Sequence, residues 1–465
     1  MRAVDVHGFG GGFTLGAVQA GWELVAKKSR YVGFGVLNTL ANRQLLGDHW
    51  ESQAEPPDHW TVEDDVQMVF GNPPCSGFST LSPKKFRGED SVINECMWEL
   101  VTYAGRVSPE IVIFESVQQA YTQGRGLMRQ LRDKLEEMTG LRYQLYHVLM
   151  NNASTGGCSI RKRYFWVASR VEFGVDDVNT RWDFIHDQLV VYDPHTVPSL
   201  DDVIRDLEPL SQTMLPQMYP SAIPGVDWDF DVDEFVITKT DVVDASQWCR
   251  DHVHDGSGIV DGHDVIRPPM LARIEELARE VDGVSPWRQG ERISDVLRRY
   301  YEDHGQLPRS WRYVSFKKVD HDGKIVVQPI MKDERLVETD FSMGHNQPIR
   351  WRGERPANVV TGGAANAVVH PRQPRTLTHR EIARIQGFPD AWQIFPVRHA
   401  ADLGPGWGKG VPVHAGRWIA HFARLALEGT PGSITGEESG DRETTIDVKN
   451  KYRDRLPGSL SERVA

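Results

Sequence analysis

Short apolar runs alternate with helix-like segments through the first 170 residues, and this alternation restricts the fold more than any other feature. The strand-like runs lie at 2–6, 23–26, 66–71, 109–117, 143–150 and 160–168. Strand–helix repetition predicts an α/β fold with a doubly wound, mostly parallel sheet. In such sheets the chemistry lies at the carboxyl ends of the strands, so the residues that follow each run are the first candidates for a site.

Three of these runs end in residues that can carry chemistry. The run at 66–71 is followed by Asn72-Pro-Pro-Cys75, which presents one thiol after a tight turn. A lone cysteine there is more often a small buried residue than a nucleophile, so it needs support from other segments. Glu115 lies near the end of another apolar run, where a carboxylate needs a partner or a chemical role. Arg161 and Arg163 alternate onto one face of a strand.

The opening stretch joins a strand to a helix through the glycine-rich turn His7-Gly-Phe-Gly-Gly-Gly12. Glycines at such a turn let a cofactor approach the backbone at a helix N-terminus, although many α/β folds have one for geometry alone. Nucleotide sites usually place a carboxylate after the second strand. No carboxylate occurs between Glu23 and Asp48, where Lys27, Lys28 and Arg30 stand instead.

Composition excludes several classes of protein. The net charge of −12 argues against a generally basic coat for nucleic acid, but it allows a local basic cleft. Four cysteines without paired spacing indicate a reducing compartment and no disulfide framework. No signal peptide and no apolar run of about 18 residues is present. We expect a soluble cytoplasmic protein, from a bacterial cell or a phage-infected host, with no membrane partner.

The segment from about 171 to 350 has poor periodicity and is rich in Asp, Trp and Pro up to 265. Helices are expected at 270–281 and 292–301, and a hairpin turn at 320–323. Basic residues interleave with aromatics just before this turn, at Arg309, Arg312, Lys317 and Lys318. This combination suits phosphates and unstacked bases, and a solvated hairpin is the alternative. Cys249, His252, His254 and His263 match no zinc spacing, so no metal is expected.

The last part of the chain predicts a return to regular structure. Thr378 and Glu381 form a capping box at the start of a helix. A second glycine-rich turn at 404–412 precedes a helix at 413–427. Residues 430–465 are polar, and we expect them to be disordered.

Taken in order, these segments resemble the DNA cytosine-C5 methyltransferase family over residues 3–170 and 350–428. The stretch Pro73–Ser79 is similar to the nucleophile loop of the family, and Phe114-Glu-Ser-Val117 to its Glu-Asn-Val motif. Arg161-Lys-Arg163 is similar to its Arg-x-Arg motif, and Pro374–Pro389 to its late motif. The resemblance implies a catalytic domain at 1–170, a target-recognition domain at 171–350, a return to the catalytic domain at 351–429 and a tail at 430–465.

The resemblance also implies roles for the residues. Cys75 would add to carbon 6 of a flipped-out cytosine, and Glu115 would protonate or hydrogen-bond ring nitrogen 3. Arg161 and Arg163 would hold the base and its backbone and favour the thiolate. The loop from Ser76 to about Glu89 would close over the base. The expected partner of this monomer is double-stranded DNA, contacted by Ser76, Ser79, Arg309, Arg312, Lys317 and Lys318.

The implied cofactor is S-adenosyl-L-methionine or its carboxylated form, carboxy-S-adenosyl-L-methionine. Three departures from the family pattern concern it: the rebuilt turn at His7–Gly11, the missing ribose carboxylate, and Lys409 in place of Asn in the Gly-Asn-x-Val-Pro turn. Ser116 also replaces the Asn of the Glu-Asn-Val motif. The predicted cofactor residues are Val6, His7, Gly8, Phe9, Gly10, Gly11, Gly12, Phe13, Lys28, Ser29, Asp58, Asn72, Pro74, Lys409, Gly410 and Val411.

Lys409 suggests a specific hypothesis. A lysine buried beside the cofactor needs a counter-charge, and no acidic residue lies near it in sequence. An additional carboxylate on the cofactor would supply that charge, and the enzyme would then install a carboxymethyl group. The alternative is that Lys409 faces solvent or a DNA phosphate.

Two other functions compete with DNA modification. The first is an RNA cytosine-C5 methyltransferase, which the long segment at 171–350 disfavours. The second is a catalytically silent homologue that binds DNA, supported only by the changes at the cofactor turn. A pure binder has no use for a nucleophile, so the presence of Cys75 with Glu115, Arg161 and Arg163 favours an enzyme.

Overall fold

The computed structural model describes residues 1–30, 38–79 apart from 40, 41, 48 and 54, 87–175, and parts of 182–207, 278–304, 313–339, 349–392 and 408–448. Its contacts divide the chain into two units. One unit comprises Met1–His263, Glu354–Gly362 and Thr378–Ala465, and the other Asp264–Gly353 and Gly363–Leu377. The first unit therefore extends well past the domain boundary predicted at 171, and the chain enters the second unit twice.

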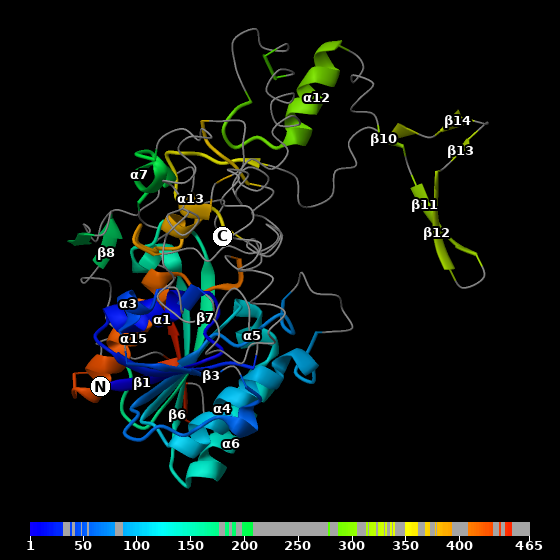
Figure 1. The fold of residues 1–465 in the computed structure, drawn as a ribbon. Coiled ribbons are helices and arrows are strands. Elements are labelled where there is room, and N and C mark those ends of the chain that lie inside the picture. The colour runs from blue at the N-terminus through cyan, green and yellow to red at the C-terminus, as the bar shows by residue number, and fades with distance from the viewer. Residues whose placement is uncertain are drawn as a thin grey trace, which may run out of the picture. The chain divides into compact units, whose positions relative to one another are not determined.

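A nine-stranded sheet forms the centre of the first unit, with strand order β18-β19-β6-β7-β5-β4-β1-β2-β3 (Figure 1). Its strands are β1 (Arg2–Val6), β2 (Glu23–Lys28), β3 (Glu51–Gln53), β4 (Met68–Gly71), β5 (Ile111–Ser116), β6 (Gln144–Asn151), β7 (Lys162–Ser169), β18 (Glu437–Glu438) and β19 (Glu443–Asp447). The pairs are parallel except where β7 meets β5 and β6 and where β18 meets β19. The predicted α/β class with a mostly parallel sheet is confirmed.

Helices cover both faces of this sheet (Figure 1). On one face, α1 (Gly12–Gln19) packs against α15 (Val413–Leu427), whose bounds are those predicted. A Cβ atom on Gly16 would lie 2.4 Å from the backbone nitrogen of Arg417, so these helices approach closely only because residue 16 is glycine. On the other face lie α4 (Glu95–Val107) and α6 (Arg125–Thr139), which bury their apolar stripes in the core.

Shorter elements complete the first unit. They are α3 (Arg43–Leu46), α5 (Gln118–Gln123), β8 (Trp182–Ile185), β9 (Gln188–Val191), α7 (Leu200–Ile204) and α13 (His379–Ile385). The helix predicted to start at the capping box is therefore present as α13, whereas Thr378 itself lies outside the described residues. Within the part of the chain that the structure describes, no helix combines the length and apolar character that crossing a membrane requires.

The second unit contains α12 (Ile293–His304) and a series of short strands. These are β10 (Tyr313–Val314), β11 (Phe316–His321), β12 (Lys324–Pro329), β13 (Met331–Lys332), β14 (Arg335–Leu336), β15 (Glu338–Thr339), β16 (Ile349–Arg350) and β17 (Val368–Val369). Strands β11 and β12 pair with His321 opposite Lys324, which confirms the predicted hairpin. Lys317 and Lys318 lie on β11. Arg309, Arg312, most of the helix predicted at 270–281 and the Cys249–His263 cluster lie outside the described residues.

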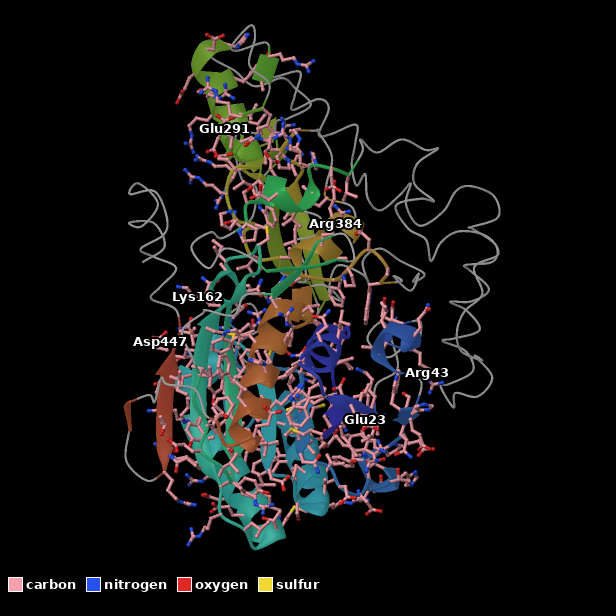
Figure 2. All side chains as sticks on the ribbon, turned by 90° about the vertical axis from the view of Figure 1, so that its left-hand side faces the viewer. Glu23, Arg43, Lys162, Glu291, Arg384 and Asp447 are labelled. Carbon is pink, nitrogen blue, oxygen red and sulfur yellow. The ribbon has the colours of Figure 1, made fainter. Side chains whose placement is uncertain are left out.

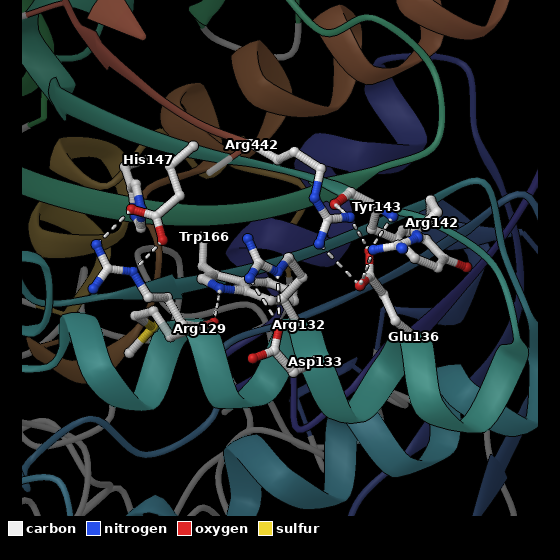
Figure 3. Close-up of polar contacts among 11 residues, drawn as sticks. Arg129, Arg132, Asp133, Glu136, Arg142, Tyr143, His147, Trp166 and Arg442 are labelled. Carbon is white, nitrogen blue, oxygen red and sulfur yellow. Dashed lines mark hydrogen bonds and ion pairs between the residues drawn. The ribbon is translucent and has the colours of Figure 1, made fainter. Parts of the chain in front are cut away.

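The C-terminal strand β19 corrects the prediction that residues 430–465 are disordered. It adds to the sheet parallel to β6, with Glu443 opposite Leu145 and Asp447 opposite Leu149. Asp447 and Lys162 lie at the same end of the sheet (Figure 2). Ion pairs with α6 hold the start of the strand. Glu443 pairs with Arg129, and Arg442, which directly precedes the strand, donates to Glu136 at 2.5 and 3.2 Å (Figure 3).

If β19 is part of the cooperative fold, truncating its one large apolar residue will destabilise the protein. Ile446 is fully buried, so Ile446→Ala leaves a cavity and should lower the free energy of unfolding by about 2–4 kcal/mol. Urea denaturation followed by circular dichroism measures this. Val62→Ala, at a position that is 43% exposed, is the matched control and should change stability little. Equal stability of Ile446→Ala and wild type would show that the strand does not dock.

Candidate active site

The register of β4 and β5 brings Asn72 and Glu115 together at the carboxyl edge of the sheet. Gly71 lies opposite Phe114 in this parallel pair, so the next residue on each strand is a neighbour of the other. Asn72 Nδ2 donates a hydrogen bond to Glu115 Oε2 at 2.6 Å. The two residues are 4% and 1% exposed. The structure therefore places Asn72, a predicted cofactor residue, against the predicted catalytic carboxyl group.

Strand β7 brings Arg163 to the same carboxyl group from the other side. It runs antiparallel to β5, with Glu115 opposite Phe165, so Arg163 lies two residues away on the same face. Arg163 Nε pairs with Glu115 Oε1, and Arg163 Nη1 donates to the carbonyl of Lys162 at 2.8 Å. Both oxygens of the buried carboxyl group are thus held by side chains from neighbouring strands.

Cys75 lies partly buried in the turn after β4, where it packs against the core. Burial raises the pKa of its thiol, and the charge of Glu115 raises that pKa further. Arg163, the backbone N–H of Val117 and Arg161 act in the opposite direction. Burial also raises the pKa of Glu115, against the opposing charges of Arg163 and Arg161. The site therefore favours a neutral carboxyl group beside the thiol.

Arg161 has different protein contacts from Arg163, and the prediction that both hold the base stays a prediction. It is 1% exposed, and it donates to the carbonyl of Val360 at 2.8 Å. Its Nη2 donates to the carbonyls of Gly408 and Gly410 at 2.7 and 2.9 Å. Arg161 therefore clamps the second glycine turn to the edge of the sheet near Cys75.

Lys409 stands between these two clamped carbonyls, and its side chain is exposed. Of the two alternatives for Lys409, burial beside the cofactor or exposure, the structure has the exposed one, on a turn whose backbone Arg161 holds. Gly410 is half-buried and Val411 is buried.

The turn after β1 has a backbone conformation that requires glycine. Gly10 and Gly11 adopt φ angles of 72° and 82°, in the left-handed region that favours glycine. A Cβ atom on Gly8 would lie 2.0 Å from the Asp5 carboxylate. Gly8, Gly10, Gly11 and Gly12 are all buried, and a Cβ atom on Gly11 would lie 2.8 Å from the ring of Trp392, so other parts of the chain pack closely on this turn. Of the other predicted residues here, Phe13 packs on Phe70 and Phe165, and Val6 belongs to the core.

The basic residues at the end of β2 are paired with carboxylates from elsewhere in the chain. Lys27 Nζ lies 2.7 Å from Asp5 Oδ2 and donates to the carbonyl of Gly8 at 2.5 Å. The sequence reasoning missed Asp5, although a carboxylate inside an apolar strand was the signal for such a partner. Lys27 therefore braces the cofactor turn.

Lys28 and Arg30 are likewise paired with carboxylates of the chain. Lys28 Nζ donates to Glu63 at 2.5 Å, to Gln53 at 2.8 Å and to Thr61 at 3.0 Å. Arg30 pairs with Glu95 at 2.7 Å and with Glu99 at 3.0 Å. The ammonium group of Lys28, a predicted cofactor residue, is therefore committed to a protein network.

His7, Cys96 and Glu99 bring three ligand-type atoms within 4.8 Å of one another. His7 Nε2 lies 2.8 Å from Glu99 Oε2. The guanidinium group of Arg30 contacts the other carboxylate oxygen and lies 3.9 Å from Cys96 Sγ. A cation already neutralises this cluster, and it would repel a divalent metal ion. The residues form a polar cluster that Arg30 joins, rather than a metal centre.

The remaining predicted residues lie around these groups. Phe9 is half-buried, Ser29 is buried, and Gly12 is the first residue of α1. Ser76 and Ser79, which follow Cys75, are half-buried. Pro74 and Asp58 are exposed. Residues 80–86 of the predicted closing loop lie outside the described residues.

The charge of Glu115 should be visible in the reactivity of Cys75. Because that charge raises the pKa of the thiol, Glu115→Gln should lower the pKa and shift alkylation by iodoacetamide to lower pH. Peptide mass spectrometry at a series of pH values gives the rate at Cys75. Buried Cys96 and Cys158 are internal controls and should react slowly in both proteins. If the pH dependence of alkylation at Cys75 stayed the same or moved to higher pH in Glu115→Gln, the proposed electrostatic coupling would be contradicted.

Comparison with known proteins identifies the family. The chain is 24% identical to the DNA (cytosine-5)-methyltransferase CMT3 of Arabidopsis thaliana, over 75% of this chain and 42% of that protein. It is 21% identical to the type II methyltransferase M.DdeI of Desulfomicrobium norvegicum, over 84% of this chain and 79% of that one. The crystal structure of S. pombe Dnmt2 methyltransferase aligns with a TM-score of 0.46 at 13% identity, over 92% of this chain and 99% of that one. The family model for C-5 cytosine-specific DNA methylases matches residues 1–422, and the chain belongs to that family.

Proposed function

We propose that this protein alkylates carbon 5 of cytosine in double-stranded DNA, with Cys75 as the nucleophile. The observation that carries the proposal is the meeting of a thiol, a buried carboxyl group and Arg163 at the ends of β4, β5 and β7. Carbon 5 of cytosine is too weak a nucleophile to take an alkyl group directly. A thiolate that adds to carbon 6 removes this obstacle, and a neutral carboxyl group beside ring nitrogen 3 assists the addition.

In the proposed sequence, Sγ of Cys75 forms a bond to carbon 6. The electrons of the C5–C6 double bond shift toward carbon 4 and nitrogen 3. Nitrogen 3 takes the proton of Glu115. The resulting enamine is nucleophilic at carbon 5. The family uses S-adenosylmethionine, which when bound supplies the electrophilic group. After transfer, water takes the proton from carbon 5, the electrons of that bond re-form the C5–C6 double bond, and the C6–Sγ bond breaks to regenerate the thiolate, while nitrogen 3 returns its proton to Glu115.

Several parts of the chain support recognition of DNA in this proposal. A cytosine within a duplex cannot reach Cys75, so it must leave the base stack. The loop from Ser76 to Glu89 directly follows the nucleophile in sequence and would cover an extruded base. The basic patch that includes Lys317 and Lys318 would contact the phosphates.

Carboxymethyl transfer is a second candidate, and Lys409 is the observation that favours it. Lys27, Lys28 and Arg30 are each paired with carboxylates, so none offers a spare charge to an additional carboxylate on the cofactor. Lys409 is exposed, in the turn that Arg161 clamps beside the nucleophile. An exposed ammonium group there could meet the additional carboxylate of carboxy-S-adenosylmethionine.

Covalent trapping tests the nucleophile. A DNA duplex with 5-fluorocytosine at the target position, incubated with S-adenosylmethionine, should form a stable adduct with the wild-type protein, because fluorine blocks loss of the substituent at carbon 5. Cys75→Ser should form none. Denaturing gels and mass spectrometry of the adduct report the result. Absence of any adduct would favour a silent DNA-binding homologue, and trapping on transfer RNA alone would favour an RNA enzyme.

Nucleoside mass spectrometry identifies the transferred group. DNA treated with S-adenosylmethionine should contain 5-methylcytosine, and DNA treated with carboxy-S-adenosylmethionine should contain 5-carboxymethylcytosine if Lys409 binds the additional carboxylate. Lys409→Asn should then lose carboxymethyl transfer by at least about tenfold and keep methyl transfer, because only the carboxylated cofactor needs the cation. Formation of 5-methylcytosine with S-adenosylmethionine, and no modified cytosine with the carboxylated cofactor, would exclude the second candidate.

A further inference from the structure

The site contains a side-chain amide at a position that the motif pattern does not predict. Ser116 occupies the position where the Glu-Asn-Val motif of the family has Asn, and its side chain is fully buried. Among the described residues, nothing forms a hydrogen bond with its hydroxyl oxygen. Asn72 lies on the neighbouring strand, and its amide reaches the catalytic carboxyl group.

We propose that Asn72 is a positioning residue that orients Glu115 for the proposed reaction, and is not a cofactor ligand. This inference rests on the proposed function of Glu115. Its geometric support is the 2.6 Å hydrogen bond from Asn72 Nδ2 to Glu115 Oε2, between side chains that are 4% and 1% exposed. A bond of this length between buried groups fixes the plane of the carboxyl group, because neither partner can exchange it for water.

The chemistry explains why a neutral amide suits this place. Arg163 already pairs with the other oxygen of Glu115, and the charges of Arg161 and Cys75 also act there. A further cation in direct contact with the carboxyl group would favour its ionised form more strongly and oppose transfer of a proton to the base. An amide N–H fixes the direction of the group and adds no net charge. Asn72 therefore orients Glu115 and leaves its proton available.

The hydrogen bond has a predictable effect on titration. Donation from Asn72 favours the ionised form of Glu115, so it holds down the first pKa of the coupled pair formed by Glu115 and Cys75. The singly protonated pair is the reactive form, and its first pKa sets the acid limb of the rate–pH profile. Removing the amide raises that pKa and moves the acid limb to higher pH.

Hydrogen exchange at carbon 5 tests this proposal without the cofactor. The addition of Cys75 to carbon 6 labilises the hydrogen at carbon 5, so duplex DNA tritiated there reports the step through tritium release. Asn72→Ala should slow release by about 10- to 100-fold, as expected for a misoriented catalytic group. The acid limb of the rate–pH profile of Asn72→Ala should lie at higher pH than that of the wild-type protein. The isosteric Asn72→Asp should move the limb further, because two carboxyl groups then share one proton.

Binding of S-adenosylhomocysteine, measured by calorimetry, separates positioning from cofactor contact. The Kd of both variants should stay within about twofold of wild type, which also shows that they are folded. Gln67→Ala, at the opposite end of β4, is the control and should change neither quantity. A Kd that rises while the acid limb stays in place would overturn the proposal and assign Asn72 to the cofactor. If Asn72→Ala does not fold, the isosteric Asn72→Asp decides alone. Absence of tritium release from the wild-type protein would instead disprove the function proposed for Cys75 and Glu115.

Discussion

The buried carboxyl group of Glu115 is the constraint on which the rest of the site depends. A fully buried carboxyl group must be neutral or held by donors, and here the donors come from the strands on either side of β5. This arrangement needs the antiparallel direction of β7. In a wholly parallel sheet the first residues of that strand would lie at the opposite edge from Glu115. Because β7 is reversed, Arg163 and the preceding Arg161 reach the carboxyl edge, where one pairs with Glu115 and the other clamps the turn at Gly408.

The cofactor side of the molecule shows how a change of charge can be neutralised within the protein. Basic residues follow β2 where the family has an acidic one, yet Asp5, Glu63 and Glu99 each pair with one of them. The pocket wall thus gains no free cation from Lys27, Lys28 or Arg30. Lys27 also donates to the carbonyl of Gly8, so its charge supports the turn that receives the cofactor. A preference for a more acidic cofactor would therefore come from another segment, and among the described residues the turn at 408–410 carries the exposed Lys409.

Features that depend on strand order and strand ends could be predicted from the sequence. The parallel sheet, the bounds of α15 and the location of Glu115 at a strand end follow from apolar patterning alone. Features that depend on register or on distant contacts could not. The contact of Asn72 with Glu115 requires the alignment of β4 with β5. The exposure of Lys409 depends on hydrogen bonds from Arg161, which is about 250 residues away in sequence.

The C-terminal strand shows why polarity alone is a poor guide to disorder. Residues 443–447 contain one large apolar side chain, which cannot by itself offset the entropy of ordering five residues. The additional stabilisation comes from partners that the fold has already placed. Backbone hydrogen bonds to β6 extend the sheet, and Arg129 on α6 meets Glu443. His147 lies beside that carboxylate, and burial lowers its pKa to about 4, so it is neutral at pH 7 and leaves the charge of Glu443 to Arg129. A polar segment therefore docks where the sheet edge and one cation are preformed, and neither is visible within the segment itself.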